Sequence, residues 1–253
     1  MTLAHWQGWA AGLALGYGAV CLLMGATQRS FLYFPQPAAD PTQQLVLPVA
    51  GTKVLVAHRP HPGPRALIYF GGNAEDVSLT RADLAALLPD TALYLLHYRG
   101  YGGSEGTPSE TAIRADAQAL HALVAQRHSA ITVVGRSLGT GPAVHLAATQ
   151  PIQRLVLLVP FDSLLAVARS AMPWLPVDLL LQDRWDAAAE ASRVRAPTTL
   201  VAAANDRVVP PRHAEALYRA FSPGVADLVV VTDLGHNAPI LSTAAFRQAL
   251  QQR

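Results

Sequence analysis

A long apolar run opens the chain. Residues Trp9–Thr27 include no charged side chain, and Arg29 marks the return to polar sequence. Nineteen residues in a helix reach about 28 Å, close to the hydrocarbon thickness of a bilayer. Aromatic residues flank the run, as they do at membrane interfaces: Trp6 and Trp9 at one end, and Phe31, Tyr33 and Phe34 at the other. The pattern predicts an uncleaved transmembrane anchor over residues 1–30.

Other interpretations of this run fit less well. A cleaved signal peptide would have Lys or Arg ahead of a shorter apolar run and an Ala-x-Ala type of cleavage site, and a buried core helix would carry a polar face. Gly8, Gly12 and Gly16 share one helix face, a spacing that permits close helix contact in lipid, but glycine is common in membrane helices and we predict no oligomer from it. Arg29, Arg59 and Arg65 follow the run and no Lys or Arg precedes it. This favours a cytosolic catalytic domain only weakly, so the side of the membrane stays open.

Beyond a Pro-rich linker at residues 31–44, short apolar runs alternate with amphipathic stretches. Two β-like segments around Gly51, Leu45–Val49 and Thr52–His58, predict a hairpin at a sheet edge. Continuous apolar runs, as expected of strands buried on both faces of a parallel sheet, follow at Ala66–Phe70, Ala92–Leu96, Ile131–Val134, Leu155–Val159, Thr199–Ala203 and Leu228–Val231. Helices are predicted at Leu79–Leu88, Ser109–Arg127, Leu138–Thr149, His213–Phe221 and Ala238–Gln251. This repetition predicts an α/β domain over residues 45–253, with a mostly parallel sheet and helices on both faces.

The composition excludes several classes of protein. Of the 253 residues, 51% are hydrophobic and 14% are charged, which is incompatible with a disordered chain. The formal net charge of +2 provides no field that would recruit nucleic acid. Cys21 is the single cysteine, so the chain has neither an intramolecular disulfide framework nor a cysteine-based zinc cluster.

The most specific motif joins a predicted strand to a predicted helix. The sequence Gly135-Arg136-Ser137-Leu138-Gly139 fits G-x-S-x-G, in which a sharp turn holds a serine hydroxyl above the sheet. Gly135 and Gly139 let the strand and the helix approach without a Cβ clash. The turn also leaves the Leu138 N–H unpaired and directed at the place where an oxyanion would form. The motif predicts Ser137 as a nucleophile.

The same glycines also fit a nucleotide-binding loop. Gly135 to Gly141 match G-x-x-x-G-x-G, a pattern of short-chain dehydrogenases, which resemble one another further in a Tyr-x-x-x-Lys pair. Lys53 is the only lysine, and Val49 precedes it by four residues, so this pair is missing. No G-x-x-x-x-G-K-[ST] sequence is present either, so the sequence supports neither a dehydrogenase nor an ATPase.

A serine nucleophile needs a histidine base and an orienting acid, which in this kind of fold follow it in the order acid, then histidine. Asp206 comes after the next-to-last strand and His236 after the last, so both are expected at the edge where Ser137 emerges. Asp162, which follows the strand Leu155–Val159, is a second candidate acid, but Asp206 occupies the commoner strand end. The other histidines precede the serine or lie on predicted helices, which favours solvated or core positions for them.

A second oxyanion donor is expected in the loop after the first central strand. There, Gly71-Gly72 lets the backbone N–H of Asn73 turn inward, opposite that of Leu138. As structure alone the two glycines form an ordinary turn, but their position favours the functional interpretation.

Together these residues resemble the α/β-hydrolase family, and more closely its small membrane-anchored branch, the alpha/beta hydrolase-domain serine hydrolases and their bacterial relatives. The matching stretches are FLYFPQP, FGGNAEDV, YRGYGGSEGTPSE, VVGRSLGTGPAVHLA, NDRVVP and LGHN, between residues 31 and 237. The resemblance implies an acyl-enzyme hydrolase of esters, thioesters or amides that uses neither a metal nor an organic cofactor. Some membrane-anchored members remove acyl groups from lipids or lipidated proteins.

Three positions depart from the family pattern. Gly71 stands where His is common, His97 where Asp commonly precedes Tyr-Arg-Gly, and Ala238 where Asp often follows His-Asn. The first two affect the oxyanion loop and its packing, so we expect them to bear on rate rather than on reaction type. Arg99 and Tyr101 are interpreted as structural anchors of their own loop.

The segment 164–197 stands where relatives have a lid, and it is short here. Its stretch Met172–Pro176 is apolar and rigid, and could line an acyl pocket, face the bilayer or form core; we favour acyl binding. The sequence thus predicts a membrane-anchored serine hydrolase that cleaves ester or thioester bonds of a small-molecule or lipid acyl substrate through Ser137, Asp206 and His236. A serine peptidase or amidase of the same fold and a non-catalytic membrane-tethered scaffold are the alternatives.

Overall fold

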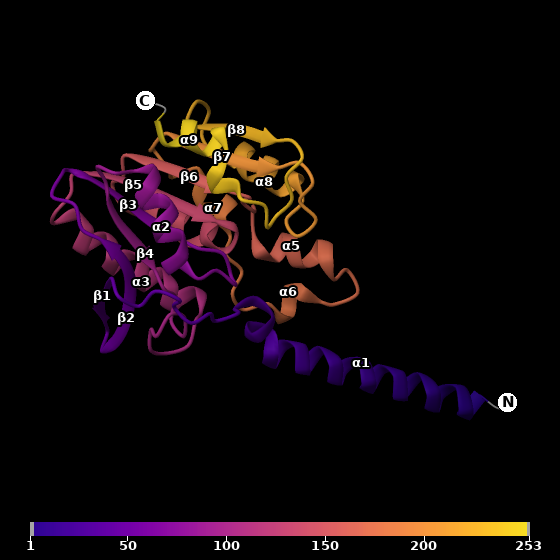
Figure 1. Ribbon diagram of the computed structural model, residues 1–253. Helices are drawn as coiled ribbons and strands as arrows, with labels where there is room; N and C mark the ends of the chain where they lie inside the picture. The colour runs from indigo at the N-terminus through magenta and orange to yellow at the C-terminus, as the bar shows by residue number, and fades with distance from the viewer. Residues whose placement is uncertain (1–2, 252–253) are drawn as a thin grey trace.

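An eight-stranded sheet forms the centre of the structure, a computed structural model that describes residues 3–251 (Figure 1). In spatial order its strands are β1 (Gln44–Val49), β2 (Thr52–Arg59), β4 (Ala92–Leu96), β3 (Arg65–Phe70), β5 (Ala130–Arg136), β6 (Arg154–Leu158), β7 (Thr198–Ala203) and β8 (Ala226–Val231). Only β2 runs against the others, because it pairs antiparallel with β1 and with β4 while every other pair is parallel. The predicted parallel sheet with a hairpin at its edge is confirmed.

The central strands coincide with the continuous apolar runs. Every residue of β4, β6 and β7 is buried, because helices cover both faces of the sheet at these strands. The edge hairpin turns at Ala50 and Gly51, whose φ angles of 47° and 79° are the left-handed values that a tight two-residue hairpin turn uses.

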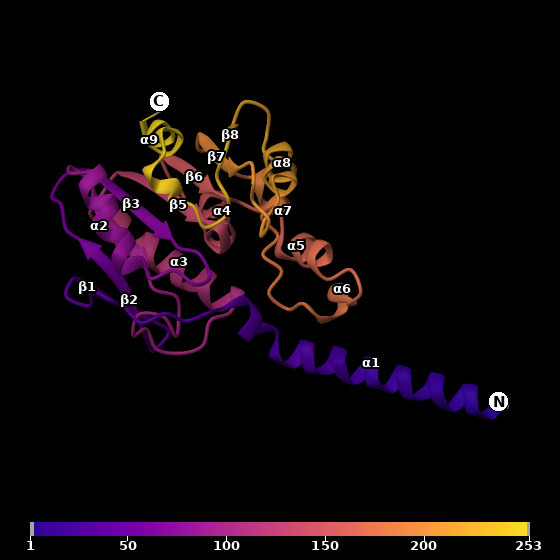
Figure 2. The same cartoon turned by 45° about the vertical axis from the view of Figure 1, so that its right-hand side comes forward.

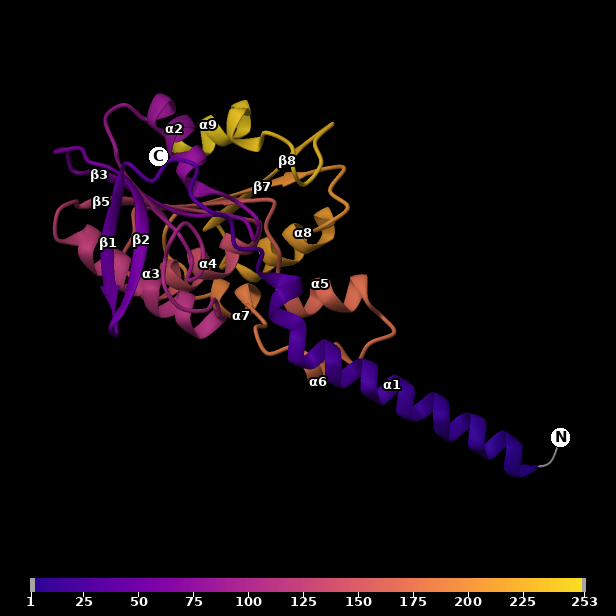
Figure 3. The ribbon, with the colours of Figure 1, turned by 60° about the horizontal axis from the view of Figure 1, so that its bottom comes forward.

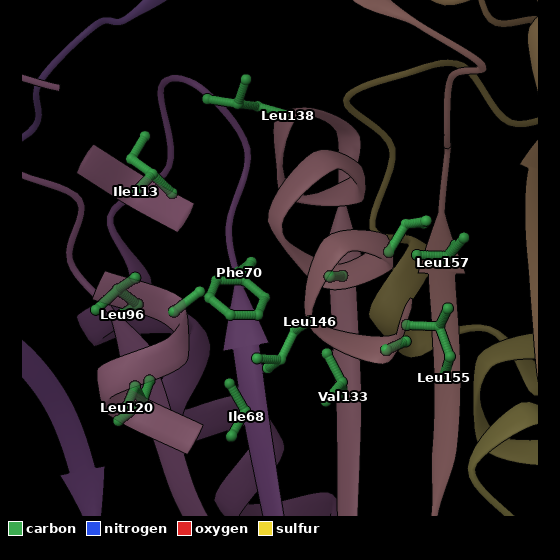
Figure 4. Close-up of a cluster of buried hydrophobic side chains, with 14 of the residues drawn as sticks. Ile68, Phe70, Leu96, Ile113, Leu120, Val133, Leu138, Leu146, Leu155 and Leu157 are labelled. Atoms are coloured by element: carbon green, nitrogen blue, oxygen red, sulfur yellow. The ribbon is translucent and has the colours of Figure 1, made fainter. Parts of the chain in front are cut away.

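Two layers of helices enclose the sheet (Figure 3). One face is covered by α3 (Glu110–Ala125), α4 (Thr140–Thr149), α7 (Ala187–Ala191) and α8 (Pro211–Ala220), and the other by α2 (Val77–Leu87) and α9 (Ala244–Gln251). Each face has its own apolar core. On the first face, Ile68 and Phe70 of β3 and Val133 of β5 belong to the same cluster as Leu120 of α3 and Leu146 of α4 (Figure 4).

The N-terminal helix α1 (Leu3–Leu32) projects from this body (Figure 2). Its part Trp9–Leu32 is long and apolar enough to cross a membrane, although a signal sequence meets the same criteria. Large apolar side chains such as Leu13, Leu15 and Leu22 are about three-quarters exposed. The helix runs past residue 30 and takes up the first two residues of the predicted linker.

The lid-like segment between β6 and β7 contains two further short helices ahead of α7, namely α5 (Leu164–Ala171) and α6 (Val177–Leu180). After α6 the chain buries Trp185, whose ring packs so closely on α4 that a Cβ at Gly141 would lie 2.2 Å from it. This contact fixes the end of the segment to the helix that follows Ser137.

Four predicted helix starts, at Leu79, Leu138, His213 and Ala238, differ from the observed ones by two residues or more. The last helix begins at Ala244 rather than Ala238, because residues 240–242 form a 3₁₀ turn and the Thr243 hydroxyl then accepts the Phe246 N–H as a helix cap. The preceding helix α8 begins at Pro211 rather than His213, since proline suits the first position of a helix. These shifts change the lengths of loops at the carboxyl ends of the strands but leave Asp206 and His236 in those loops.

Candidate active site

Ser137 directly follows β5 and is the first residue of the 3₁₀ turn η1 (Ser137–Gly139), which leads into α4. Its φ of 50° is in the left-handed region, which is uncommon for a residue other than glycine. Both flanking glycines are required sterically: a Cβ at Gly135 would lie 2.4 Å from the Gly139 carbonyl oxygen, and one at Gly139 would lie 2.0 Å from the Phe70 carbonyl oxygen. The strained turn therefore presents the serine at the carboxyl end of β5.

The structure brings Ser137, His236 and Asp206 together. The loops after β5, β7 and β8 carry these residues, and the carboxyl ends of parallel strands lie at one edge of a sheet. The Ser137 Oγ lies 2.8 Å from the His236 Nε2, and the His236 Nδ1 lies 2.7 Å from the Asp206 Oδ2. The three side chains form one hydrogen-bonded chain from a partly exposed hydroxyl to a buried carboxylate.

The Asp206 carboxylate is held on both sides. Its Oδ1 accepts the backbone N–H groups of Val208 and Val209 at 2.9 and 2.8 Å, and its Oδ2 faces the His236 ring. Only 1% of its side chain is exposed. Because the loop fixes this carboxylate, it orients the histidine with the Nδ1 hydrogen towards Asp206 and the Nε2 towards Ser137.

A cavity of about 260 Å³ opens beside the serine, lined by Gly72–Glu75, Arg136, Ser137, His236 and Asn237. A Cβ at Gly72 would lie 3.9 Å from the Ser137 Cβ, so the loop after β3 passes directly beside the hydroxyl. The Gly72 N–H donates to the Glu75 carboxylate at 2.8 Å, whereas the Asn73 N–H has no acceptor among residues 3–251. Asn73 therefore brings an unused backbone donor to the cavity wall.

A larger cavity of about 470 Å³ lies at the other edge of the sheet, where Arg65, Ala130 and Arg154 begin β3, β5 and β6. It contains none of the predicted site residues. Across residues 3–251, no group of three or more His, Cys, Asp or Glu side chains is arranged to hold a metal ion.

The chain leaving α1 holds the Asn73 loop, a role that the sequence did not predict. The Asn73 carbonyl accepts the Phe34 N–H at 3.0 Å and the Tyr101 hydroxyl at 2.6 Å, and the Asn73 side chain donates to the Leu32 carbonyl at 3.1 Å. Burial raises the pKa of the Tyr101 phenol, which stays protonated and can donate. Tyr101 is thus an anchor for the loop beside Ser137 and not only for its own loop.

Glu75 holds the same loop from the other side, and it too was missed in the sequence. Its carboxylate accepts the Gly72 N–H, the Tyr69 hydroxyl at 2.9 Å and the Thr80 hydroxyl at 2.6 Å. The Arg136 guanidinium lies 3.4 Å from it. An acid three residues beyond a Gly-Gly turn was the available signal, since such a side chain can cap the turn's free N–H groups.

The second candidate acid has a different partner. The Asp162 Oδ1 lies 2.8 Å from the Nδ1 of His213, which is on α8 and is only 4% exposed. The His213 Nε2 is buried and has no hydrogen-bond partner among the described residues. Asp162 therefore serves a core histidine and is not placed on the chain that leads to Ser137.

The departures from the family pattern have local explanations. At Gly71 a Cβ would lie 2.7 Å from the Val77 Cγ1, so a larger residue does not fit without a shift. His97 is buried against Gly102, and burial lowers its pKa to about 4, so its ring is neutral at pH 7. Ala238 contributes its N–H to the turn after His236, where it donates to the Gly235 carbonyl. None of the three changes the contacts between Ser137, His236 and Asp206.

Arg99 anchors its own loop, in keeping with its interpretation from the sequence. Its guanidinium forms a bidentate ion pair with Asp116 on α3, at 2.8 and 3.0 Å, and that carboxylate is fully buried.

The sheet order and the strand–turn–helix around Ser137 define the class of protein as an α/β-hydrolase fold. Among solved structures, the esterase Pf2001 of Pyrococcus furiosus has a TM-score of 0.66 at 16% identity, covering 83% of this chain and 92% of the esterase. The monoacylglycerol lipase of Paleococcus ferrophilus has a TM-score of 0.60 at 17% identity, covering 78% and 96%. These likenesses show the shared fold.

Similarity in sequence extends to named relatives. The chain is 36% identical over 249 residues to the uncharacterized protein Rv2307c of Mycobacterium tuberculosis, covering 90% of this chain and 87% of that protein. It is 30% identical over 186 residues to the alpha/beta hydrolase domain-containing protein aho-3 of Caenorhabditis elegans, covering 71% and 54%. A scan against family models finds no match. The chain belongs to the α/β-hydrolase family, as its sequence motifs predicted.

Proposed function

We propose that the protein is a membrane-anchored serine hydrolase that cleaves carboxylic ester or thioester bonds of an acyl substrate. One observation carries the proposal: the Ser137 hydroxyl, the His236 ring and the Asp206 carboxylate form a continuous hydrogen-bonded chain, with contacts of 2.8 and 2.7 Å. A serine next to a base that is itself oriented by an acid is the arrangement that nucleophilic catalysis requires. The neighbours named esterase and monoacylglycerol lipase support an ester as the first substrate to test.

The reaction follows from this arrangement. The His236 Nε2 takes the proton of Ser137 as the Oγ attacks the acyl carbon, and Asp206 stabilises the resulting imidazolium. The N–H groups of Asn73 and Leu138 bind the tetrahedral oxyanion. When the intermediate collapses, the leaving alcohol or thiol receives the proton from His236, which leaves Ser137 acylated. A water molecule, activated by the same histidine, then releases the acid and restores the serine.

The substrate is a small-molecule or lipid acyl compound, and the membrane is reached through α1. The exposed apolar surface of Trp9–Leu32 supports a single-pass anchor over a buried core helix, because a core helix would be covered by the rest of the protein. Nucleic acid is not proposed as a partner, since the formal net charge is only +2.

A fluorophosphonate probe tests the proposal on the full-length protein in detergent. We expect labelling at Ser137, no labelling of Ser137→Ala, and normal labelling of the matched control Ser242→Ala, an exposed serine outside the site. Turnover of a p-nitrophenyl ester should fall by several powers of ten in Ser137→Ala. Wild-type turnover by this variant would exclude the proposed nucleophile.

The probe, followed by a panel of acyl esters, acyl-thioesters and aminoacyl amides, separates the two alternative functions. A folded protein that does not react with the probe would favour a non-catalytic membrane-tethered scaffold. A protein that reacts with it but prefers aminoacyl amides over acyl esters and acyl-thioesters would favour a peptidase or amidase.

A further inference from the structure

The tip of the lid-like segment, defined here as residues Met172–Leu181, lies against the N-terminal helix. The Tyr17 hydroxyl donates to the Trp174 carbonyl at 2.8 Å, and the Gln28 amide donates to the Leu180 carbonyl at 2.9 Å. A Cβ at Gly25 would lie 3.4 Å from the Leu180 Cδ2. Figures 2 and 3 show α6 beside the C-terminal half of α1. The lid tip therefore follows α1 from Tyr17 to Gln28.

The contact with the lid tip falls inside the apolar stretch of α1. The candidate span Trp9–Leu32 includes Tyr17, Gly25 and Gln28. From Trp9 to Tyr17 the axis rises by only about 12 Å, and the hydrocarbon core is about 30 Å thick. A bilayer placed around this stretch therefore also surrounds part of the protein that lies beside Tyr17.

The surface of the lid tip suits such an environment. The Trp174 side chain is 59% exposed and that of Leu179 is 85% exposed, although both are large and apolar. The charged groups nearby are paired: Arg169 forms an ion pair with Asp178, and the Arg184 guanidinium donates to the carbonyls of Asp178 and Leu181. Pairing lowers the cost of placing these charges close to lipid.

We propose that the lid tip inserts into one leaflet of the bilayer beside α1, with Trp174 and Leu179 in contact with acyl chains. The insertion rests on the proposed anchoring role of α1, and only the delivery of a substrate from the membrane rests on the proposed chemistry of Ser137. The lid-like segment leaves the sheet after β6, at the edge where Ser137 is presented after β5, so the inserted tip connects the leaflet to that edge. A substrate with an acyl chain in the membrane then reaches the site from the lipid phase.

Tryptophan fluorescence tests the insertion without any assay of activity. The chain has four tryptophans, and replacing Trp6 and Trp9 by Phe leaves Trp174 and the fully buried Trp185. In phosphatidylcholine vesicles we expect part of the emission to be quenched by lipid brominated in the acyl chain and protected from aqueous iodide. A further Trp174→Phe replacement should abolish the lipid quenching, because Trp185 is covered by protein.

The outcomes separate insertion from anchoring. Flotation of the protein with vesicles reports on membrane association as a whole. A protein that floats but whose Trp174 is quenched by iodide and not by brominated lipid overturns the insertion. A protein that does not float overturns the insertion together with the anchor.

An activity measurement gives an independent test. We expect Leu179→Asp to lower the rate on an acyl ester held in vesicles by about tenfold or more and to leave the rate on a soluble p-nitrophenyl ester unchanged. Val46→Asp is the matched control, since Val46 is also exposed but lies on the edge strand β1. Equal rates of Leu179→Asp and Val46→Asp on vesicles contradict the proposal.

Discussion

Two histidine–aspartate pairs lie at the same edge of the sheet, yet only one of them meets a serine. His236 and Asp206 are 2.7 Å apart, and His213 and Asp162 are 2.8 Å apart, so the pairs match in their central hydrogen bond. The two pairs differ in what surrounds the histidine and in what surrounds the aspartate. The His236 Nε2 faces the Ser137 Oγ, whereas the His213 Nε2 is buried and has no partner within the described part of the chain.

The acids differ in the same way. The second carboxylate oxygen of Asp206 accepts two backbone N–H groups, whereas the second oxygen of Asp162 has no hydrogen-bond partner within residues 3–251. The Asp162 side chain is 20% exposed and the Asp206 side chain is 1% exposed. An aspartate next to a histidine is therefore no indication of catalysis by itself. What distinguishes the candidate site is the group on the far nitrogen of the ring and the rigidity of the acid.

The largest expected difference between the pairs is at the histidines. His236→Ala removes the proposed base, and turnover of a p-nitrophenyl ester should fall about 10⁴-fold or more, as for the loss of a triad histidine in general. His213→Ala should change turnover by less than about tenfold, because among the described residues its ring hydrogen-bonds to Asp162 and not to Ser137 or Asp206. Steady-state kinetics of the two purified variants decide it, and equal losses would remove the distinction drawn between the pairs.

A somewhat smaller difference is expected at the acids. Asp206→Asn keeps the shape but lets the ring adopt the wrong tautomer, which should lower kcat by about four powers of ten with little change in KM. Asp162→Asn, the matched control, should stay within about threefold of the parent protein. If Asp162→Asn proved the more damaging to kcat, the roles assigned to the two acids would have to be exchanged.

The smallest expected effect is on stability, where the loss of His213 should matter more than the loss of His236. His213→Ala leaves a hole in a buried position and an unpaired carboxylate, and we expect it to lower the free energy of unfolding by about 1–3 kcal/mol. Denaturant titration measures this loss for His213→Ala and His236→Ala side by side. His236 lies in the wall of an open cavity, so its removal should cost less. A larger loss at His236 would mean that its pair with Asp206 holds the fold as well.

The sheet was accessible from the sequence, whereas the contacts that position its loops were not. Strands such as Ala92–Leu96 are predicted to the residue, because burial on both faces leaves a continuous apolar run. The start of α9 at Ala244 was not predicted, because the helix begins where the Thr243 side chain caps it. Helices α5 and α6 have no long apolar period to reveal them.

The candidate site likewise has a part that the sequence predicted and a part that it did not. The grouping of Ser137, Asp206 and His236 followed from turn chemistry and chain order, and their catalytic roles stay a prediction. The bond from Tyr101 to Asn73 joins residues 28 positions apart, and the one from Asn73 to Leu32 joins residues 41 apart. Such pairings depend on where loops meet in space, which periodicity along the chain does not encode.

The packing of Trp185 on Gly141 limits how this protein can be re-engineered. An alanine at position 141 would place a methyl group inside the indole, so the helix behind the nucleophile and the return of the lid-like segment can change only together. A chimera that borrows a longer cap from a relative should therefore join upstream of Trp185 and keep the glycine. Residues 164–182 form the segment that can be replaced, and it ends before Asp183 because this residue forms an ion pair with Arg29.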